Sequence, residues 1–397
     1  MTFKCVFRYV FIIFFLLEGC NVKEDAGIPF QQQITDIKNE YAPDKRVALF
    51  NVEAIRSSDS YILKGESNLP NAVDALKLKL TANKIDFIDS VQLLPSKGLK
   101  GETQAVINIS VANLRSQPKH SAELATQATL GTPVKVYKKE GDWFLIQTPD
   151  QYLSWVDAGG IQLMDSLSIV EWKSSEKIIY TKTYGHTYSK SDKESQVVSD
   201  IVAGAVLETI GQVSDFFEVR YPDGRTAFVA TDEAQHYDQW LGHLNTTTES
   251  LVATSKKLMG VPYLWGGTST KGVDCSGFTK TIYFLNGMVI PRDASQQVHT
   301  GKPIDSTKNF ENLIKGDLLF FGRKATDSTA EKVVHVGMWI GNNEFIHSSN
   351  MVRISSMDPN APNFDPWNRD RYLRSKRILK EEEDGLINLV NTPIFKD

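Results

Sequence analysis

The chain has 397 residues, 41% of them hydrophobic and 23% charged, which is the composition of an ordinary globular protein able to form several cores. Its 44 Lys and Arg residues nearly balance 48 Asp and Glu residues, and the formal net charge of −4 argues against a nucleic-acid partner. Three cysteines, Cys5, Cys20 and Cys275, are too few for a disulfide framework. Cys275 lies far from the other two and is therefore a candidate reactive thiol.

Residues 1–20 have the pattern of an export signal. Lys4 and Arg8 precede an apolar run at 9–17, which at about 1.5 Å per residue is too short to span a bilayer. The run ends in Leu17-Glu18-Gly19-Cys20, which resembles the lipobox of bacterial lipoproteins, although Glu18 stands where a small or apolar residue is usual. The resemblance implies an acylated Cys20 that anchors an exported chain to a bacterial membrane, on its periplasmic face or the outer surface. Ordinary secretory cleavage, with Cys20 removed or free, is the alternative.

The next segments suggest a tether and a small packing unit. We expect residues 21–45 to form a polar linker, as a tether or a short helix, and residues 46–103 a small α+β unit. Its expected elements are β-rich runs at 47–55, 61–63 and 87–94 and a helix that begins at Pro70, with Val73, Leu76 and Leu80 on one face. These patterns indicate packing or docking and give no chemical function.

Residues 104–164 and 165–240 read as two copies of one β-rich domain. In the first copy, short β-rich runs recur at 105–109, 134–137, 143–147 and 154–156. The second copy repeats the pattern weakly, at a spacing of roughly 70 residues. The segments Val111–Pro118 and Gly141–Phe144 resemble bacterial SH3-like domains, and this resemblance implies two small β-barrels in tandem.

The environment of Cys275 indicates chemistry. Asp274 is placed to cap a helix in which Phe278, Ile282 and Leu285 share one face, so that Cys275 lies in the first turn. A helix start favours a thiolate over a thiol, and this position therefore predicts a nucleophile. A buried core thiol is the alternative.

Two histidines follow in β-rich runs. His335 lies in the run 333–341 and His347 in the run 344–349, with Gly341-Asn342-Asn343 as the turn of an expected antiparallel hairpin. A cysteine nucleophile needs a base, and often a third group that orients the base. We therefore predict His335 as the base and His347 as its orienting partner, with core histidines as the alternative.

Five motifs in order resemble the NlpC family of papain-like cell-wall cysteine peptidases. They are Pro262-Tyr263-Leu264-Trp265-Gly266-Gly267, Asp274-Cys275-Ser276-Gly277-Phe278, the run 316–321, His335-Val336-Gly337 with Gly341, and Phe345-Ile346-His347. The resemblance covers residues 245–385 and leaves 386–397 as a tail. It implies a multidomain α+β protein in which SH3-like domains precede a papain-like catalytic domain. It also implies that Tyr263 lies on the oxyanion side and that Asp274 supports the nucleophile.

A subgroup of that family carries two SH3-like domains before the catalytic domain, as this chain does. The resemblance implies cleavage between D-glutamate, linked through its side chain, and an L-diamino acid in peptidoglycan stem peptides with a free amino-terminal L-Ala. It gives Asp293, in the run 292–297, the role of binding the substrate amine. The remaining expected substrate-binding residues are Arg292, Ser295, Tyr152, Ser276 and Trp265.

Two other functions remain open from the sequence. One is an endopeptidase of intact peptidoglycan, with the SH3-like domains as wall-targeting modules; the other is a wall-binding lipoprotein without activity. For the main hypothesis, the stem-peptide endopeptidase, we expect a monomer with no cofactor and no metal. Its partners would be stem peptides and, through the lipid, a membrane.

Overall fold

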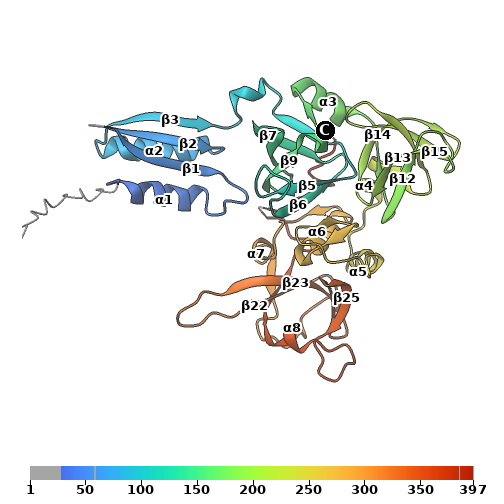
Figure 1. Ribbon diagram of the computed structural model, residues 1–397. Coiled ribbons are helices and arrows are strands. Elements are labelled where there is room, and N and C mark those ends of the chain that lie inside the picture. Colours follow the sequence, from blue (N-terminus) through green and yellow to red (C-terminus); the bar gives the residue numbers. More distant parts are fainter. Residues whose placement is uncertain (1–27, 58–59, 384, 397) are drawn as a thin grey trace, which may run out of the picture.

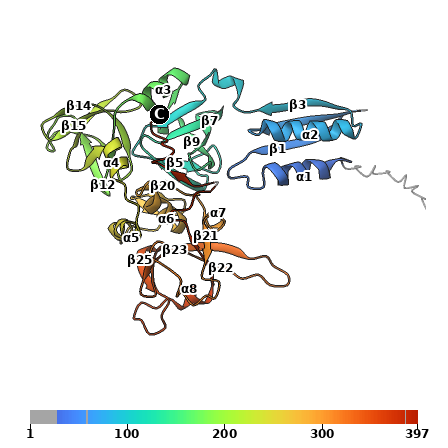
Figure 2. The same cartoon turned by 180° about the vertical axis from the view of Figure 1, so that it is seen from behind.

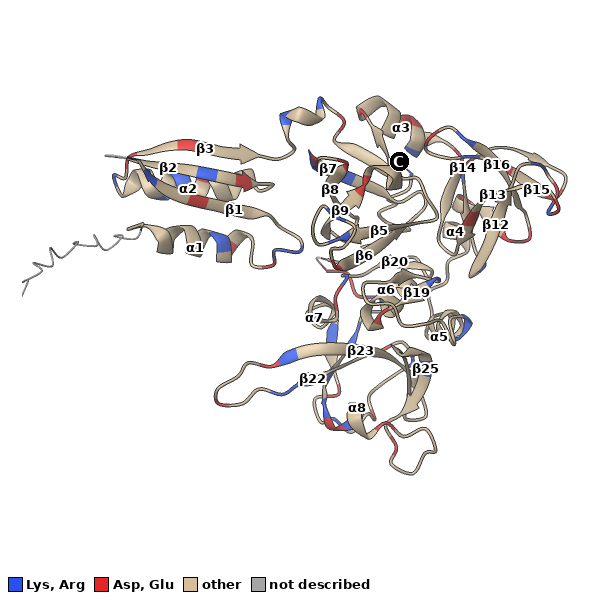
Figure 3. Cartoon of the chain, viewed as in Figure 1, with Lys and Arg blue, Asp and Glu red and all other residues tan. Residues whose placement is uncertain are grey.

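A computed structural model describes residues 28–57, 60–383 and 385–396, so the expected export signal and Cys20 lie outside the described residues. The chain forms an N-terminal unit, two β-rich units and a C-terminal unit (Figure 1). Within these described ranges no helix is long and apolar enough to cross a membrane. Acidic and basic residues are scattered over all the units (Figure 3).

The N-terminal unit is a three-stranded sheet covered by two helices. Strand β2 lies between β1 and β3, antiparallel to the first and parallel to the second. Its elements are α1 (Gln31–Tyr41), β1 (Phe50–Ser57), β2 (Ser60–Ser67), α2 (Pro70–Ala82) and β3 (Phe87–Leu93). The helix predicted from Pro70 is confirmed, and Val73, Leu76 and Leu80 are buried in the core of this unit.

The described part of the segment 21–45 contains a helix, which is one of the two forms expected for it. Residues 31–41 form α1, whose Ile34 and Ile37 are buried in the same core as Leu76 of α2. The composition of this helix is polar because only two of its eleven residues are buried in the core. The N-terminal unit therefore begins before residue 46.

The first β-rich unit is a seven-stranded sheet in the order β10-β4-β7-β8-β9-β5-β6. Its elements are η1 (Lys97–Leu99), β4 (Gln104–Ile107), β5 (Val111–Arg115), β6 (Leu124–Thr129), β7 (Pro133–Glu140), β8 (Trp143–Gln147), β9 (Leu153–Asp157), η2 (Ala158–Gly160) and β10 (Ile161–Met164). Alternating residues of these strands, such as Leu114, Val136 and Ile146, form its core.

The second β-rich unit has the same topology. Its order, β17-β11-β14-β15-β16-β12-β13, matches the order of the first sheet strand for strand. The elements are α3 (Ser166–Ser174), β11 (Lys177–Tyr180), β12 (Tyr184–Tyr188), β13 (Val197–Val202), β14 (Val206–Val213), β15 (Phe216–Arg220), β16 (Thr226–Ala230), β17 (Ala234–His236) and α4 (Tyr237–His243). The weak self-similarity of the sequence thus corresponds to a repeated strand order.

The C-terminal unit packs helix α6 (Cys275–Phe284) on a six-stranded antiparallel sheet of order β21-β26-β22-β23-β24-β25. Its other elements are α5 (Thr248–Lys257), β18 (Thr268–Ser269), β19 (Gly272–Val273), β20 (Met288–Val289), α7 (Ala294–Gln297), β21 (Lys302–Ile304), β22 (Leu318–Arg323), β23 (Lys332–Gly341), β24 (Glu344–Ser349), β25 (Met351–Ser356), α8 (Pro366–Asp370), β26 (Tyr372–Arg377) and β27 (Ile387–Asn388). The predicted hairpin is present as β23 and β24, and Asn342 and Asn343 at its turn both have positive φ.

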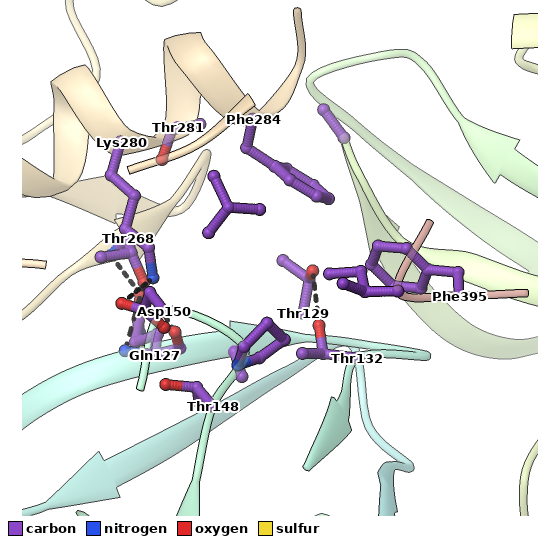
Figure 4. Close-up of a pocket in the computed structure, with 15 residues that line it drawn as sticks. Gln127, Thr129, Thr132, Thr148, Asp150, Thr268, Lys280, Thr281, Phe284 and Phe395 are labelled. Atoms are coloured by element: carbon purple, nitrogen blue, oxygen red, sulfur yellow. Dashed lines mark hydrogen bonds and ion pairs between the residues drawn. The ribbon is translucent and has the colours of Figure 1, made fainter. Parts of the chain in front are cut away.

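Residues 386–397 were expected to form a C-terminal tail. Their described part, residues 386–396, instead belongs to the packed structure. Strand β27 pairs with β20, and Leu389 and Phe395 are buried in a cluster that joins the β-rich units to the C-terminal unit. Phe395 lines a pocket between the first sheet and α6, which Lys280 and Asp150 bridge by an ion pair of 2.8 Å (Figure 4). The described tail therefore helps to fix α6 against the first β-rich unit.

Seen from both sides, α6 lies between the first β-rich unit and the six-stranded sheet (Figures 1 and 2). The N-terminal unit meets the first β-rich unit end-on, and the β22–β23 hairpin extends on the same side of the molecule. Leu49 and Leu94 of the N-terminal unit pack with Tyr137 and Trp143 of the first sheet. Three separate units consequently surround the start of α6.

Candidate active site

Cys275 is the first residue of α6 and is buried, as the sequence predicts for the nucleophile position. The helix begins there because the Asp274 carboxylate accepts a hydrogen bond of 2.7 Å from the backbone N–H of Gly277. Phe278 and Ile282 anchor the helix in the core. A side chain at Gly277 would lie 1.9 Å from the carbonyl oxygen of Gly267, so only glycine allows this close approach.

A buried ion pair fixes Asp274. The Arg292 side chain is 1% exposed, and its Nη2 lies 2.6 Å from Asp274 Oδ2. Arg292 also donates to Ser276 Oγ and, from Nε, to Thr126 Oγ1 of the first sheet. Arg292 and Ser276 thus position the nucleophile loop, and both also line the cleft that contains Cys275, where the substrate contacts expected for them stay a prediction.

The two predicted histidines meet on neighbouring strands. His335 of β23 and His347 of β24 are buried, with His335 Nε2 lying 2.7 Å from His347 Nδ1. This contact leaves Nδ1 of His335 as the nitrogen that can act as a base. For that role, His335 must carry its proton on Nε2 and donate it to His347.

Ser355 extends this relay and was missed by the sequence analysis. Its Oγ lies 3.1 Å from His347 Nε2, from the adjacent strand β25. With His347 Nδ1 accepting from His335, His347 Nε2–H donates to Ser355 Oγ. In the β24–β25 register His347 pairs with Arg353, and Ser355 lies two residues further along β25. This register is not visible in the sequence, so no local signal indicated Ser355 as a partner of His347.

We expect Ser355→Ala to lower kcat about three- to tenfold and to leave KM unchanged, because one orienting hydrogen bond is worth roughly 1 kcal/mol. Steady-state kinetics would measure both constants. Ser356→Ala is the matched control, since Ser356 is equally buried but donates to the backbone of Asn343. Equal effects of the two variants would contradict the relay.

Burial favours the neutral forms of Cys275, His335 and His347. Burial raises the pKa of the Cys275 thiol to about 11, and the Asp274 carboxylate adds to this increase. Burial also lowers the pKa of His335 well below 6.5 and that of His347 to about 3. The helix start and the backbone N–H groups of Val336 and Ser276 favour a thiolate, but burial and Asp274 outweigh them. Burial therefore opposes the thiolate that the helix position favours.

We expect the rate of Cys275 alkylation by iodoacetamide to keep rising up to at least about pH 9, because the thiol pKa is raised rather than lowered. Activity should persist below pH 6.5, since the lowered pKa of His335 keeps this base unprotonated there. Mass spectrometry of alkylated protein between about pH 5 and pH 10 measures the first effect. A plateau that begins near pH 5 would indicate a preformed thiolate–imidazolium pair instead.

Cys275 opens into a cleft of about 520 Å3 between units. Tyr263, Trp265 and Gly266 line it from the loop before α6, and Glu123 and Tyr152 line it from the first β-rich unit. Burial raises the pKa of the Tyr263 hydroxyl, and the charges of Cys275 and Asp274 add to this increase. Trp265 is 62% exposed at the cleft and donates from Nε1 to Glu123 Oε1 at 2.7 Å.

Comparison with known proteins decides the family. Residues 260–367 match the NlpC/P60 family, and residues 110–162 match the bacterial SH3 domain. A γ-D-glutamyl-L-lysine dipeptidyl-peptidase of Bacillus cereus is 31% identical over 65% of this chain and 76% of its own length. The chain belongs to the NlpC/P60 family. It is thus a cysteine peptidase, and the expected multidomain α+β fold, with SH3-like domains before an NlpC-type catalytic domain, is confirmed.

Other NlpC/P60 relatives share more than the catalytic domain. Dipeptidyl-peptidase 6 of Lysinibacillus sphaericus is 26% identical over 65% of this chain and 93% of its own length. The crystal structure of an NlpC/P60 family protein from Bacillus cereus superposes with a TM-score of 0.59, at 26% identity over 70% of this chain and 99% of that one. The similarity therefore includes the β-rich part as well as the catalytic unit.

The NlpC/P60 cleft is also lined by Asp293. Its Oδ2 accepts a hydrogen bond of 3.1 Å from the hydroxyl of Tyr152, the residue that the resemblance implied for the first SH3-like domain. The same oxygen also accepts 2.7 Å from Arg46 Nη1 of the N-terminal unit, and Arg46 donates to Ser295 Oγ as well. Sequence reasoning missed Arg46, because nothing in a short β-rich segment indicates contact with a residue 247 positions away.

The SH3-like domain approaches the catalytic loop closely at Gly266. A side chain at this position would lie 2.2 Å from the carbonyl oxygen of Leu124, and Gly266 has a φ of +81°. Its backbone N–H donates to Asp274 Oδ2 at 3.0 Å. One glycine thus lets Leu124 of the SH3-like domain pack against the loop that binds Asp274, the residue that caps the nucleophile helix.

Proposed function

We propose that this chain hydrolyses the γ-D-glutamyl–L-diamino acid bond of peptidoglycan stem peptides and prefers stems with a free amino-terminal L-Ala. The observation that carries the proposal is a single cleft that Cys275 lines together with Asp293 and Tyr152. The Asp293 carboxylate is the partner that a partly buried substrate ammonium group requires. The name of the Bacillus relative supports the same bond, and the words dipeptidyl-peptidase in the names of the Bacillus and Lysinibacillus relatives support release of a dipeptide.

In the proposed reaction, Cys275 Sγ attacks the γ-carbonyl carbon of D-glutamate while its proton passes to Nδ1 of His335. His347 and Ser355 keep the imidazole oriented during this transfer. The amine of the diamino acid leaves with that proton. A water molecule then hydrolyses the thioester, which releases L-Ala-γ-D-Glu and restores the thiol.

The test measures cleavage of four substrates by the same purified protein. They are L-Ala-γ-D-Glu-L-Lys, its diaminopimelate counterpart, the N-acetylated tripeptide and intact sacculi. We expect mass spectrometry to identify L-Ala-γ-D-Glu and a free diamino acid, and kcat/KM to be at least about tenfold higher for the free amine than for the N-acetylated tripeptide. Preference for sacculi would support the intact-wall endopeptidase instead, and cleavage after L-Ala would contradict the bond assignment.

We also propose that Cys20 is acylated and anchors the exported protein to a bacterial membrane. The basic start at Lys4 and Arg8, the short apolar run and Leu17-Glu18-Gly19-Cys20 support this anchor. Detergent phase partitioning should place the wild-type protein from a bacterial host in the detergent phase and Cys20→Ala in the aqueous phase. Aqueous partitioning of both proteins would contradict acylation.

A further inference from the structure

Arg46 holds the carboxylate that the proposed function gives to the substrate amine. Its guanidinium donates from Nη1 to Asp293 Oδ2 at 2.7 Å and to Ser295 Oγ at 2.9 Å. The Arg46 and Asp293 side chains are 33% and 26% exposed, so the pair lies at the rim of the cleft and faces solvent. The terminal ammonium group of a substrate would donate to the same Asp293 oxygen, because it needs the same kind of anionic acceptor as the guanidinium.

The N-terminal unit holds Arg46 in this place through its backbone. The carbonyl oxygen of Arg46 accepts 2.7 Å from the backbone N–H of Leu153, and that of Val47 accepts 3.0 Å from Gln147 Nε2. Both donors belong to the first SH3-like domain. The segment is therefore docked on the domain that also supplies Tyr152 to Asp293.

Arg46 has a second anionic partner on its own segment. Its Nε and Nη2 both donate to the two carboxylate oxygens of Asp44 at 2.8 Å. Asp44 in turn accepts from Gln296 Nε2 of the catalytic unit. The guanidinium can therefore leave Asp293 and still keep a bidentate carboxylate partner, which makes the exchange with another cation inexpensive in free energy.

We propose that Arg46 is a specificity-determining residue that competes with the terminal ammonium group of the substrate for Asp293. A stem peptide with a free amino terminus displaces the guanidinium, whereas an N-acylated stem brings no cation that could replace it. Arg46 thereby lowers the affinity for free-amine stems and leaves the affinity for N-acylated stems unchanged. This role rests on the proposed function of Asp293 and gives the N-terminal unit a part in substrate selection.

Binding to the inactive Cys275→Ala protein tests this competition. Isothermal titration would compare L-Ala-γ-D-Glu-L-Lys with its N-acetylated form, before and after adding Arg46→Met. We expect Arg46→Met to tighten binding of the free-amine tripeptide about three- to tenfold, as removal of a partly exposed competing ion pair allows. The same substitution should change the Kd of the N-acetylated tripeptide by less than about twofold. In an Asp293→Asn background, the effect of Arg46→Met should disappear.

Two controls separate competition from a structural role. Arg56→Met removes the same charge from an exposed position of the same unit and should leave both Kd values unchanged. Thermal unfolding shows whether Arg46→Met keeps the unit folded, and Arg46→Lys should bind the free amine with intermediate affinity. Weaker binding of the free-amine tripeptide to Arg46→Met, or an equal change for both ligands, would overturn the proposal. Failure of the unmodified protein to release L-Ala-γ-D-Glu would instead refute the proposed function.

Discussion

Replacing Cys275 with alanine is expected to lower kcat/KM for L-Ala-γ-D-Glu-L-Lys by at least about 10^4-fold. No other thiol lies among the described residues, so nothing at the start of α6 can take over the attack. The variant should fold normally, because alanine fits the space of the buried thiol and Asp274 still caps the helix. The assay is product release, followed by mass spectrometry.

The control for this prediction is binding. The Cys275→Ala protein should keep its affinity for the tripeptide and its unfolding temperature, because the cleft is lined by other residues from three units. Cleavage that continues at more than about one hundredth of the original rate would rule out Cys275 as the nucleophile.

Replacing Arg292 with methionine is expected to destabilise the protein by about 3–5 kcal/mol, because the substitution leaves the buried Asp274 carboxylate without its charge partner. Two backbone N–H groups, from Gly266 and Gly277, would still donate to this carboxylate, but neither carries a full charge. The link from Arg292 Nε to Thr126 of the first SH3-like domain would also be lost. Calorimetry would report the loss as a lower unfolding temperature of the unit that contains α6.

Arg220→Met provides the matched control for this change. Arg220 forms an ion pair of 3.2 Å with Glu208 on the second SH3-like sheet, and its side chain is 47% exposed. Solvent screens such a pair, so the same substitution should cost no more than about 1 kcal/mol. Equal losses in the two variants would mean that burial of the Arg292–Asp274 pair has no special effect.

The fold was predictable where periodicity and motifs agree. The α2 and α6 helices and the β23–β24 hairpin were predicted because apolar spacing, a cap or Pro, and a turn pointed to the same element. Helix α1 was only one of two alternatives for its segment, and the packing of the tail around Phe395 was not predicted. Each buries only a few residues and depends on partners from distant parts of the chain. Tertiary contacts decide such segments, and local sequence does not encode them.

The residues of the candidate site also fall into those that the sequence predicted and those that it did not. Cys275, His335 and His347 each carry a local signal, namely a helix start and two strands around a turn. Arg292 lies in a motif that the sequence analysis recognised. The residues around it in the sequence do not show that its guanidinium binds Asp274. Arg46 has no signal at all, since its role arises only when the N-terminal unit docks beside Asp293.

The most direct measurement of the central claim is capture of the acyl-enzyme. The protein is mixed with L-Ala-γ-D-Glu-L-Lys, quenched in acid during turnover, digested, and analysed by mass spectrometry. The account predicts a thioester of L-Ala-γ-D-Glu on the peptide that contains Cys275, with no lysine in the adduct and no adduct in Cys275→Ala. Steady turnover without this adduct, or the same adduct on another residue, would contradict attack by Cys275 on the γ-glutamyl carbonyl.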